Sequence, residues 1–167
     1  MAEQDHIDRF LARYGPRLPL TDLLVEGIVD RIGGLYRRLN REMDDTLEEF
    51  GLNHGEWKVL AALWRAGEPL AAGDLARLEN LSSGAMTNRL DRLEHSGYVR
   101  RIPDLIDRRS IKIELTTKGK RIWEKTVEAQ AEKEAVATAA LSDREKEQLT
   151  HLLRKMMIAY EKREVTR

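Results

Sequence analysis

Apolar residues recur at intervals of three and four along most of this chain, which is the pattern of amphipathic helices. Residues 4–14 form the first such segment, with Ile7, Phe10 and Leu11 on one side, and Gly15-Pro16 ends it. We expect an ordered helix here; a frayed, solvated arm is the alternative.

The longest periodic segment opens at Thr21-Asp22 and closes at Gly51. Its apolar stripe consists of Val25, Ile28, Val29, Ile32, Leu35, Tyr36, Leu39, Met43, Leu47 and Phe50. At 1.5 Å per residue such a helix is about 40 Å long, more than a domain of this size can cover with its own core. The excess stripe therefore predicts a partner chain, most simply a second copy related by a two-fold axis.

Shorter elements follow. An Asn53…Glu56 capping box starts a helix to Gly67, with Trp57, Leu60, Ala61 and Trp64 on its inner side. Residues 72–79 and 82–96 predict two helices separated by Asn80, which tolerates the left-handed conformation. Residues 98–103 and 110–115 read as two short strands.

Two helices complete the chain. Thr116 or Thr117 caps one that runs to about Ala140, and a Ser142…Glu145 capping box starts the last. The last helix is expected to bury its apolar side chains, Leu149, Leu152, Leu153, Met156, Met157 and Tyr160. The predicted fold class is mainly α with a small β wing: a winged helix-turn-helix domain with N- and C-terminal dimerisation helices.

The helix over residues 82–96 has one apolar and one polar side. At about 100° per residue, Met86, Leu90 and Leu93 face inward. The polar residues that we assign to base and backbone contacts are Ser82, Ser83, Gly84, Thr87, Asn88 and Arg92. Thr, Asn and Arg side chains can read base edges in a major groove wide enough for one helix. An ordinary solvated helix face is the alternative.

Positive charge gathers on the hairpin that follows. Between residues 100 and 121 there are eight Lys or Arg residues against three acids, although the whole chain has a formal net charge of zero. A local excess of this kind is an electrostatic footprint for phosphates. The wing residues assigned to DNA are Asp107, Arg108, Arg109 and Lys112, because a guanidinium at the tip can enter a minor groove.

These residues resemble a known family. The runs "GDLARLENLSSGAMTNRLDRLEHSGYVRR" and "PDLIDRRSIKIELTTKG" are similar to the multiple antibiotic resistance regulator (MarR) family of bacterial transcription factors. The resemblance implies a homodimer that binds a pseudo-palindromic operator, with Asp107 fixing Arg109 for the minor groove. Ala71 departs from the Ser or Thr that the family often has there. The implied division is 1–50 and 120–167 for dimerisation, and 53–119 for DNA binding.

The added N-terminal helix resembles the urate-responsive, PecS-like branch of that family. The positions corresponding to that branch's ligand site are Phe10, Lys58, Arg89 and Arg101, beside Trp57. Phe10 replaces a Trp and Lys58 replaces an acid, so the resemblance favours a carboxylate or phenolate over urate as the effector. The equal alternative is that Arg89 and Arg101 only meet phosphates and Lys58 is solvated.

Composition excludes several other classes. The chain has no cysteine, which excludes disulfides, a thiol nucleophile and Cys-type zinc sites. We expect no cofactor and no metal, and neither a membrane span nor a signal peptide is evident, so a cytoplasmic protein is expected. No phosphate loop, catalytic triad or carboxylate pair supports an enzyme. A winged-helix module that binds proteins instead of DNA is the alternative function.

Overall fold

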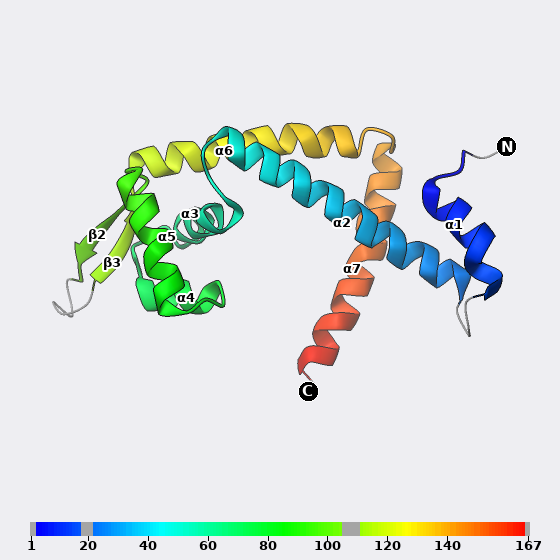
Figure 1. Ribbon diagram of the computed structural model, residues 1–167, viewed down its shortest axis with the longest axis horizontal. Coiled ribbons are helices and arrows are strands. Elements are labelled where there is room, and N and C mark those ends of the chain that lie inside the picture. The colour runs from blue at the N-terminus through cyan, green and yellow to red at the C-terminus, as the bar shows by residue number, and fades with distance from the viewer. Residues whose placement is uncertain (1–2, 18–21, 105–110, 166–167) are drawn as a thin grey trace. The chain divides into compact units, whose positions relative to one another are not determined.

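The computed structural model describes residues 3–17, 22–104 and 111–165 (Figure 1). The chain forms two compact units, Met1–Val127 and Glu128–Arg167. In order, the elements are α1 (His6–Tyr14), the 3-10 turn η1 (Gly15–Arg17), α2 (Leu23–Glu49), α3 (His54–Ala66), β1 (Leu70–Ala71), α4 (Ala72–Leu78), α5 (Ser83–His95), β2 (Val99–Pro103), β3 (Ile111–Leu115), α6 (Thr117–Ala137) and α7 (Asp143–Val165). This confirms a mainly helical fold with a small β wing.

The caps predicted from the sequence set the ends of the helices. Asn53 and Glu56 form both bonds of the capping box at the start of α3. Asn80, between α4 and α5, has a φ of 51°, in the left-handed region that the turn requires. At the start of α5, the Ser82 hydroxyl accepts the Ala85 amide at 3.3 Å. A hydrogen bond from the Ala85 amide to Ser82 therefore caps the second helix of the helix-turn-helix, whereas α4 begins at Ala71 without a side-chain cap.

The sheet has one strand more than the sequence predicted. Its order is β1-β3-β2, all antiparallel, with Leu70 opposite Ile113 and Arg101 opposite Ile113 on the other side. Ile113 is buried at the centre of the sheet, whereas Ile111, near the outer end of the hairpin, is 54% exposed. An apolar residue of β3 is thus buried only where the strand crosses the core.

One core holds the first unit together. It takes in the end of α2, helices α3, α4 and α5, the sheet and the start of α6; its largest fully buried side chains are Leu47, Leu60, Leu75, Met86, Leu90, Leu93, Ile113, Val59 and Val99. The inner side of α3 differs from the prediction, because Val59 and Leu63 are buried while Trp64 is 43% exposed. The Trp64 ring lies at the edge of the core, where it stacks on the buried Trp123 with ring centroids 4.1 Å apart.

The segment Leu115–Gly119, with the sequence Leu-Thr-Thr-Lys-Gly, joins the wing to α6. Thr116 Oγ1 donates to the Gly97 carbonyl at 2.7 Å and accepts the Gly119 amide at 3.0 Å, so Thr116 is the cap. A Cβ at Gly119 would lie 2.0 Å from the Tyr98 carbonyl oxygen. Only glycine permits this close approach, which explains the last residue of the segment.

The long stripe of α2 divides into two parts. Met43 and Leu47 are buried in the core, but the side chains nearer the start of α2 are exposed: Val25, Ile28, Val29, Ile32, Leu35, Tyr36 and Leu39. An apolar row of this length on the surface of one chain needs a further surface to cover it.

The burial predicted for the last helix is wrong for the single chain. Within the described residues, none from 147 to 164 is buried, and the six apolar side chains expected inside are all exposed. The physical reason is that the second unit has no core of its own: α7 and the end of α6 offer no layer against which a helix face could pack.

Candidate nucleic-acid interface and adjoining pocket

Helix α5 exposes its polar side and buries the opposite side. Met86, Leu90 and Leu93 are each 1% exposed, whereas the polar residues of the first turns, Ser83, Gly84, Thr87 and Asn88, are exposed. The Thr87 hydroxyl donates to the Ser83 carbonyl at 2.9 Å, so it stays close to the helix. A Cβ at Gly84 would meet nothing within 4 Å. Packing against the described part of the chain therefore does not require a glycine at this position.

The second half of α5 is tied to other elements. Arg92 Nε lies 3.1 Å from Oε1 of Glu56 on α3. Arg101 on β2 pairs with Asp91 at 2.5 Å and also with Glu94. These two carboxylates raise the pKa of Arg101 above its ordinary value, and the largest cause is the hydrogen bond that Arg101 donates to Asp91. Arg101, predicted to bind a ligand, therefore has intramolecular partners in this structure.

The strands of the wing carry two further ion pairs. Arg100 pairs with Glu114 across β2 and β3, and the hydrogen bond between them raises the pKa of Arg100. Lys112 Nζ lies 3.4 Å from Asp104. The other wing residues assigned to DNA, Asp107, Arg108 and Arg109, lie outside the described residues.

A pocket of about 670 Å³ lies between α2, α3 and the start of α5. Its lining residues are Tyr36, Asn40, Asp44, His54, Gly55, Lys58, Glu79, Leu81 and Arg89. The structure thus brings Lys58 and Arg89 together. Neither has a hydrogen-bond or ion-pair partner in the described part of the chain. On the acidic side, Asp44 lies 3.4 Å from His54 Nδ1.

Arg89 reaches the pocket across a glycine. The guanidinium lies over Gly55 in the first turn of α3, so close that a Cβ there would be 2.3 Å from Arg89 Cζ. Tyr36, Asn40 and Asp44, spaced four apart on α2, complete the wall. The sequence pattern places Tyr36 in the apolar stripe of α2 and does not single out Asn40 or Asp44. Their i, i+4 spacing on one helix face is the signal that could have found them.

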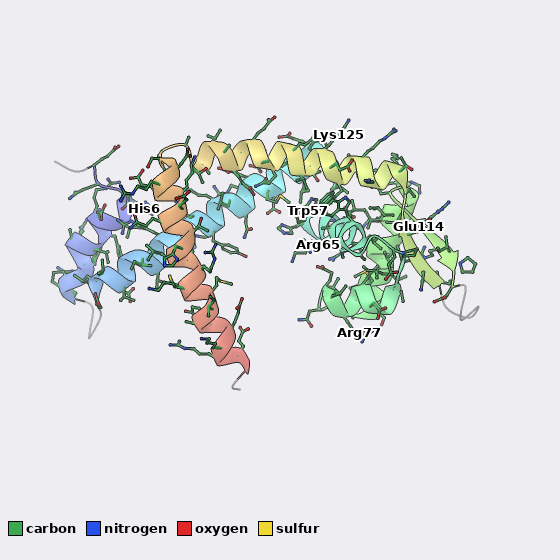
Figure 2. All side chains as sticks on the ribbon, turned by 180° about the vertical axis from the view of Figure 1, so that it is seen from behind. His6, Trp57, Arg65, Arg77, Glu114 and Lys125 are labelled. Atoms are coloured by element: carbon green, nitrogen blue, oxygen red, sulfur yellow. The ribbon has the colours of Figure 1, made fainter. Side chains whose placement is uncertain are left out.

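Two of the residues assigned to the ligand lie elsewhere. The Trp57 indole packs edge-on against His54, and its Nε1 donates to Thr126 Oγ1 on α6 at 3.0 Å (Figure 2). Phe10 is exposed on α1 and packs against Tyr14, with ring centroids 5.1 Å apart. Neither side chain lines the pocket between α2, α3 and α5.

Helix α1 is docked on α2 by charge. Arg31 pairs with Asp5 at 3.0 Å and with Asp8 at 2.6 Å, while Ile7 is buried. The Asp8 amide, followed by the Arg31 guanidinium, holds the pKa of the Asp5 carboxyl below its ordinary value. The predicted N-terminal helix is thus ordered, with Phe10 on its outer side.

Two kinds of site are not supported by the described residues. Across residues 3–17, 22–104 and 111–165, no three His, Asp or Glu side chains are grouped so as to hold a metal ion. None of the described helices combines the length and the apolar character needed to cross a membrane.

Comparison with known proteins identifies the family. Residues 52–111 match the model of the MarR family. The regulator PecS of Dickeya dadantii, described as an HTH-type transcriptional regulator, is 34% identical over 140 residues, which cover 83% of this chain and 82% of PecS. The chain belongs to the MarR family. Membership makes this MarR-family protein a transcriptional regulator rather than an enzyme.

Solved structures agree with this assignment. YusO from Bacillus subtilis is 27% identical, with a TM-score of 0.75 over 83% of this chain and 98% of YusO. A mutant of MepR from S. aureus, described as bound to an oligodeoxyribonucleotide, is 24% identical, with a TM-score of 0.64 over 80% of this chain and 97% of MepR. The latter likeness shows a shared fold.

Proposed function

We propose that this MarR-family regulator is a homodimeric repressor that binds a pseudo-palindromic DNA site and is released by a small anion. The observation that carries the DNA part is the surface of α5. Ser83, Gly84, Thr87 and Asn88 are exposed together at the start of a helix whose opposite side is buried. Recognition helices of this class read base edges with their N-terminal residues. Binding to chromosomal DNA would place the regulator in the cytoplasm.

The exposed apolar rows support the dimer. Side chains from Val25 to Leu39 on α2, and from Leu149 to Tyr160 on α7, are exposed in the single chain. Burying apolar surface contributes about 25 cal/mol per Å², so a second copy that covers these rows would be strongly favoured. Two copies would present two recognition helices, which matches two half-sites about 34 Å apart.

The pocket between α2, α3 and α5 supports the anionic effector. Lys58 and Arg89 face it without carboxylate partners in the described residues, and Tyr36 and Leu81 add aromatic and apolar surface. An aromatic carboxylate matches this lining, with its charge at the two cations and its ring against the apolar side chains. Because Arg89 belongs to α5, a ligand held there acts directly on the helix assigned to DNA.

Selection of DNA from genomic fragments by the purified full-length protein tests the main proposal. We expect enrichment of a pseudo-palindrome, and an affinity for it that falls steeply as the salt concentration rises because counterions are released from phosphates. Absence of any salt-dependent binding would contradict the proposal and favour the protein-interaction module.

Arg109→Ala tests the wing, which lies outside the described residues. We expect a loss of about 1–3 kcal/mol in binding and a weaker preference for A·T at the edges of the site. The control is Lys125→Ala, which removes the same charge from α6 (Figure 2). Unchanged base preference in Arg109→Ala would refute the role of the wing.

A reporter gene tests whether the regulator represses transcription. Expression that rises when the regulator is deleted would support repression, and expression that falls would refute it.

A further inference from the structure

The Arg92 side chain forms an ion pair with helix α3. Its Nε lies 3.1 Å from Glu56 Oε1, and the Glu56 side chain is only 9% exposed. The other carboxylate oxygen of Glu56 accepts the Asn53 amide at 3.0 Å. Both oxygens are therefore engaged, one by the cap of α3 and the other by α5.

A nearly buried carboxylate requires a counter-charge. Removing one partner of such a pair leaves an uncompensated charge in a poorly solvated place. In the described part of the chain, Arg92 is the cation in contact with Glu56. Arg92 itself is 65% exposed, so its own burial does little to keep it beside Glu56. What opposes its transfer to another partner is that the Glu56 carboxylate would lose its counter-charge.

The ion pairs of α5 join its C-terminal half to neighbouring elements. Arg92 joins α5 to α3, and Arg101 joins Asp91 and Glu94 of the same half of α5 to β2. By contrast, the exposed polar residues of the first half form no hydrogen bond or ion pair with another element in the described part of the chain. The ion pairs that tie α5 to α3 and β2 are thus in its C-terminal half, whereas the N-terminal half is held through its buried side, by Met86 and Leu90.

We propose that Arg92 is a positioning residue: through Glu56 it sets the angle of α5, and it does not contact DNA. This rests on the proposed DNA-binding function. It narrows the reading surface to Ser82, Ser83, Gly84, Thr87 and Asn88. It also makes Glu56, an acidic residue of α3, a determinant of operator affinity.

A double-mutant cycle on the full-length dimer distinguishes positioning from contact. Operator affinity is measured against salt concentration for Arg92→Gln, Glu56→Gln and the double variant. We expect each single variant to lose roughly three- to tenfold, since the pair is half exposed, and the double variant to lose no more than the weaker-binding single variant. The salt dependence should not change. Arg92→Lys should recover part of the affinity, because it restores the charge.

The matched control is Asn88→Ala, an exposed position on the same helix. Its loss should add to that of Glu56→Gln, because Asn88 does not depend on the pair. A second readout uses operators whose half-sites are moved by one base pair. Arg92→Gln should discriminate less between these operators, an effect that a simple loss of stability would not produce.

Two results would overturn the positioning role. One is additivity between Arg92→Gln and Glu56→Gln; the other is a salt dependence reduced by about one counterion in Arg92→Gln, the signature of a lost phosphate contact. Failure of the wild type to bind any fragment would instead refute the proposed function, and with it the DNA role of Arg92. Urea unfolding of the same four proteins would then still measure the coupling between Arg92 and Glu56.

Discussion

Gly55→Ala separates the stability of this regulator from its proposed ligand binding. Gly55 lies in the first turn of α3, and its φ is not positive, so alanine fits the backbone. Alanine favours a helix over glycine by up to about 1 kcal/mol. A Cβ there would lie 2.3 Å from both Cζ and Nη2 of Arg89, however. Since ordinary contacts begin near 3.5 Å, the guanidinium must retreat by roughly 1 Å.

Gly55→Ala should therefore weaken anion binding without lowering the free energy of unfolding. A charge-assisted hydrogen bond contributes about 1.5–3 kcal/mol, so losing the one from Arg89 should weaken anion binding by roughly ten- to a hundredfold. The free energy of unfolding should stay the same or increase. Isothermal titration with a panel of aromatic and aliphatic carboxylates, benzoate being the simplest, measures the first quantity, and urea unfolding measures the second.

Gly73→Ala is the matched control, because a Cβ at Gly73, on α4, meets nothing within 4 Å. It should alter the free energy of unfolding in the same direction and leave anion binding unchanged. Arg89→Ala made in the Gly55→Ala background should cost nothing further in anion affinity. Equal anion binding by wild type and Gly55→Ala would refute the assignment of Arg89 to the ligand, and no binding by the wild type would refute the pocket.

Three further predictions follow from single contacts. Thr126→Val should reduce the free energy of unfolding by about 1–3 kcal/mol in urea, because the Trp57 indole loses its acceptor, whereas Thr126→Ser should cost less; equal costs would contradict this. Leu35→Asp should convert the proposed dimer to monomers in sedimentation, because Leu35 is exposed on the apolar row of α2; a dimer that persists would show that α2 is not the interface. Hydrogen bonds from Ser142 lower the pKa of Glu145, so they stabilise the start of α7 above the unfolded value of 4.5, and this stabilisation disappears as the pH falls through the folded value. Circular dichroism should therefore show Ser142→Ala less helical than wild type at pH 7, and the difference should shrink in acid to the part contributed by the bond from the Glu145 amide to the Ser142 hydroxyl; a difference that does not change with pH would refute this.

The elements of this fold were predictable where their signals are local. The capping box at Asn53, the left-handed Asn80 and the buried row of α5 depend on residues within a few positions of one another. Strand β1 was not predictable, since it consists of two residues, Leu70 and Ala71, that become a strand only by pairing with β3. Its existence depends on a partner more than 40 positions away along the chain.

The candidate site was predictable in part, for the same reason. The polar row on α5 and the proximity of Lys58 and Arg89 follow from helical spacing and from the resemblance to the family. The intramolecular partners of Arg92 and Arg101 do not, because periodicity shows that a charged side chain faces outward and cannot show which opposite charge lies beside it. Arginines counted as free for DNA or ligand were thus already paired.

The burial of α7 could not be predicted from one chain, because amphipathicity indicates that a helix face will be covered without saying by what. Leu149 to Tyr160 are as periodic as the buried residues of α5, yet all six are exposed. The difference lies in the surroundings: α5 lies against a core, and the second unit contains none. A face that is apolar in sequence and exposed in the single chain is the mark of a surface that another chain must cover.

Helix α5 combines three roles that depend on one another. Its first half carries the polar residues proposed to read DNA, Arg89 extends from its flank into the pocket, and Arg92 ties its second half to α3. An anion bound by Arg89 and Lys58 would therefore act on the same α3–α5 pairing that Arg92 and Glu56 hold. Coupling between two ligands is reciprocal. If the anion lowers the affinity of the protein for DNA, bound DNA must lower its affinity for the anion by the same factor. The two ligands then need not touch each other. Their sites are coupled if the packing of α3 against α5 has two discrete arrangements, one favoured by DNA and the other by the anion.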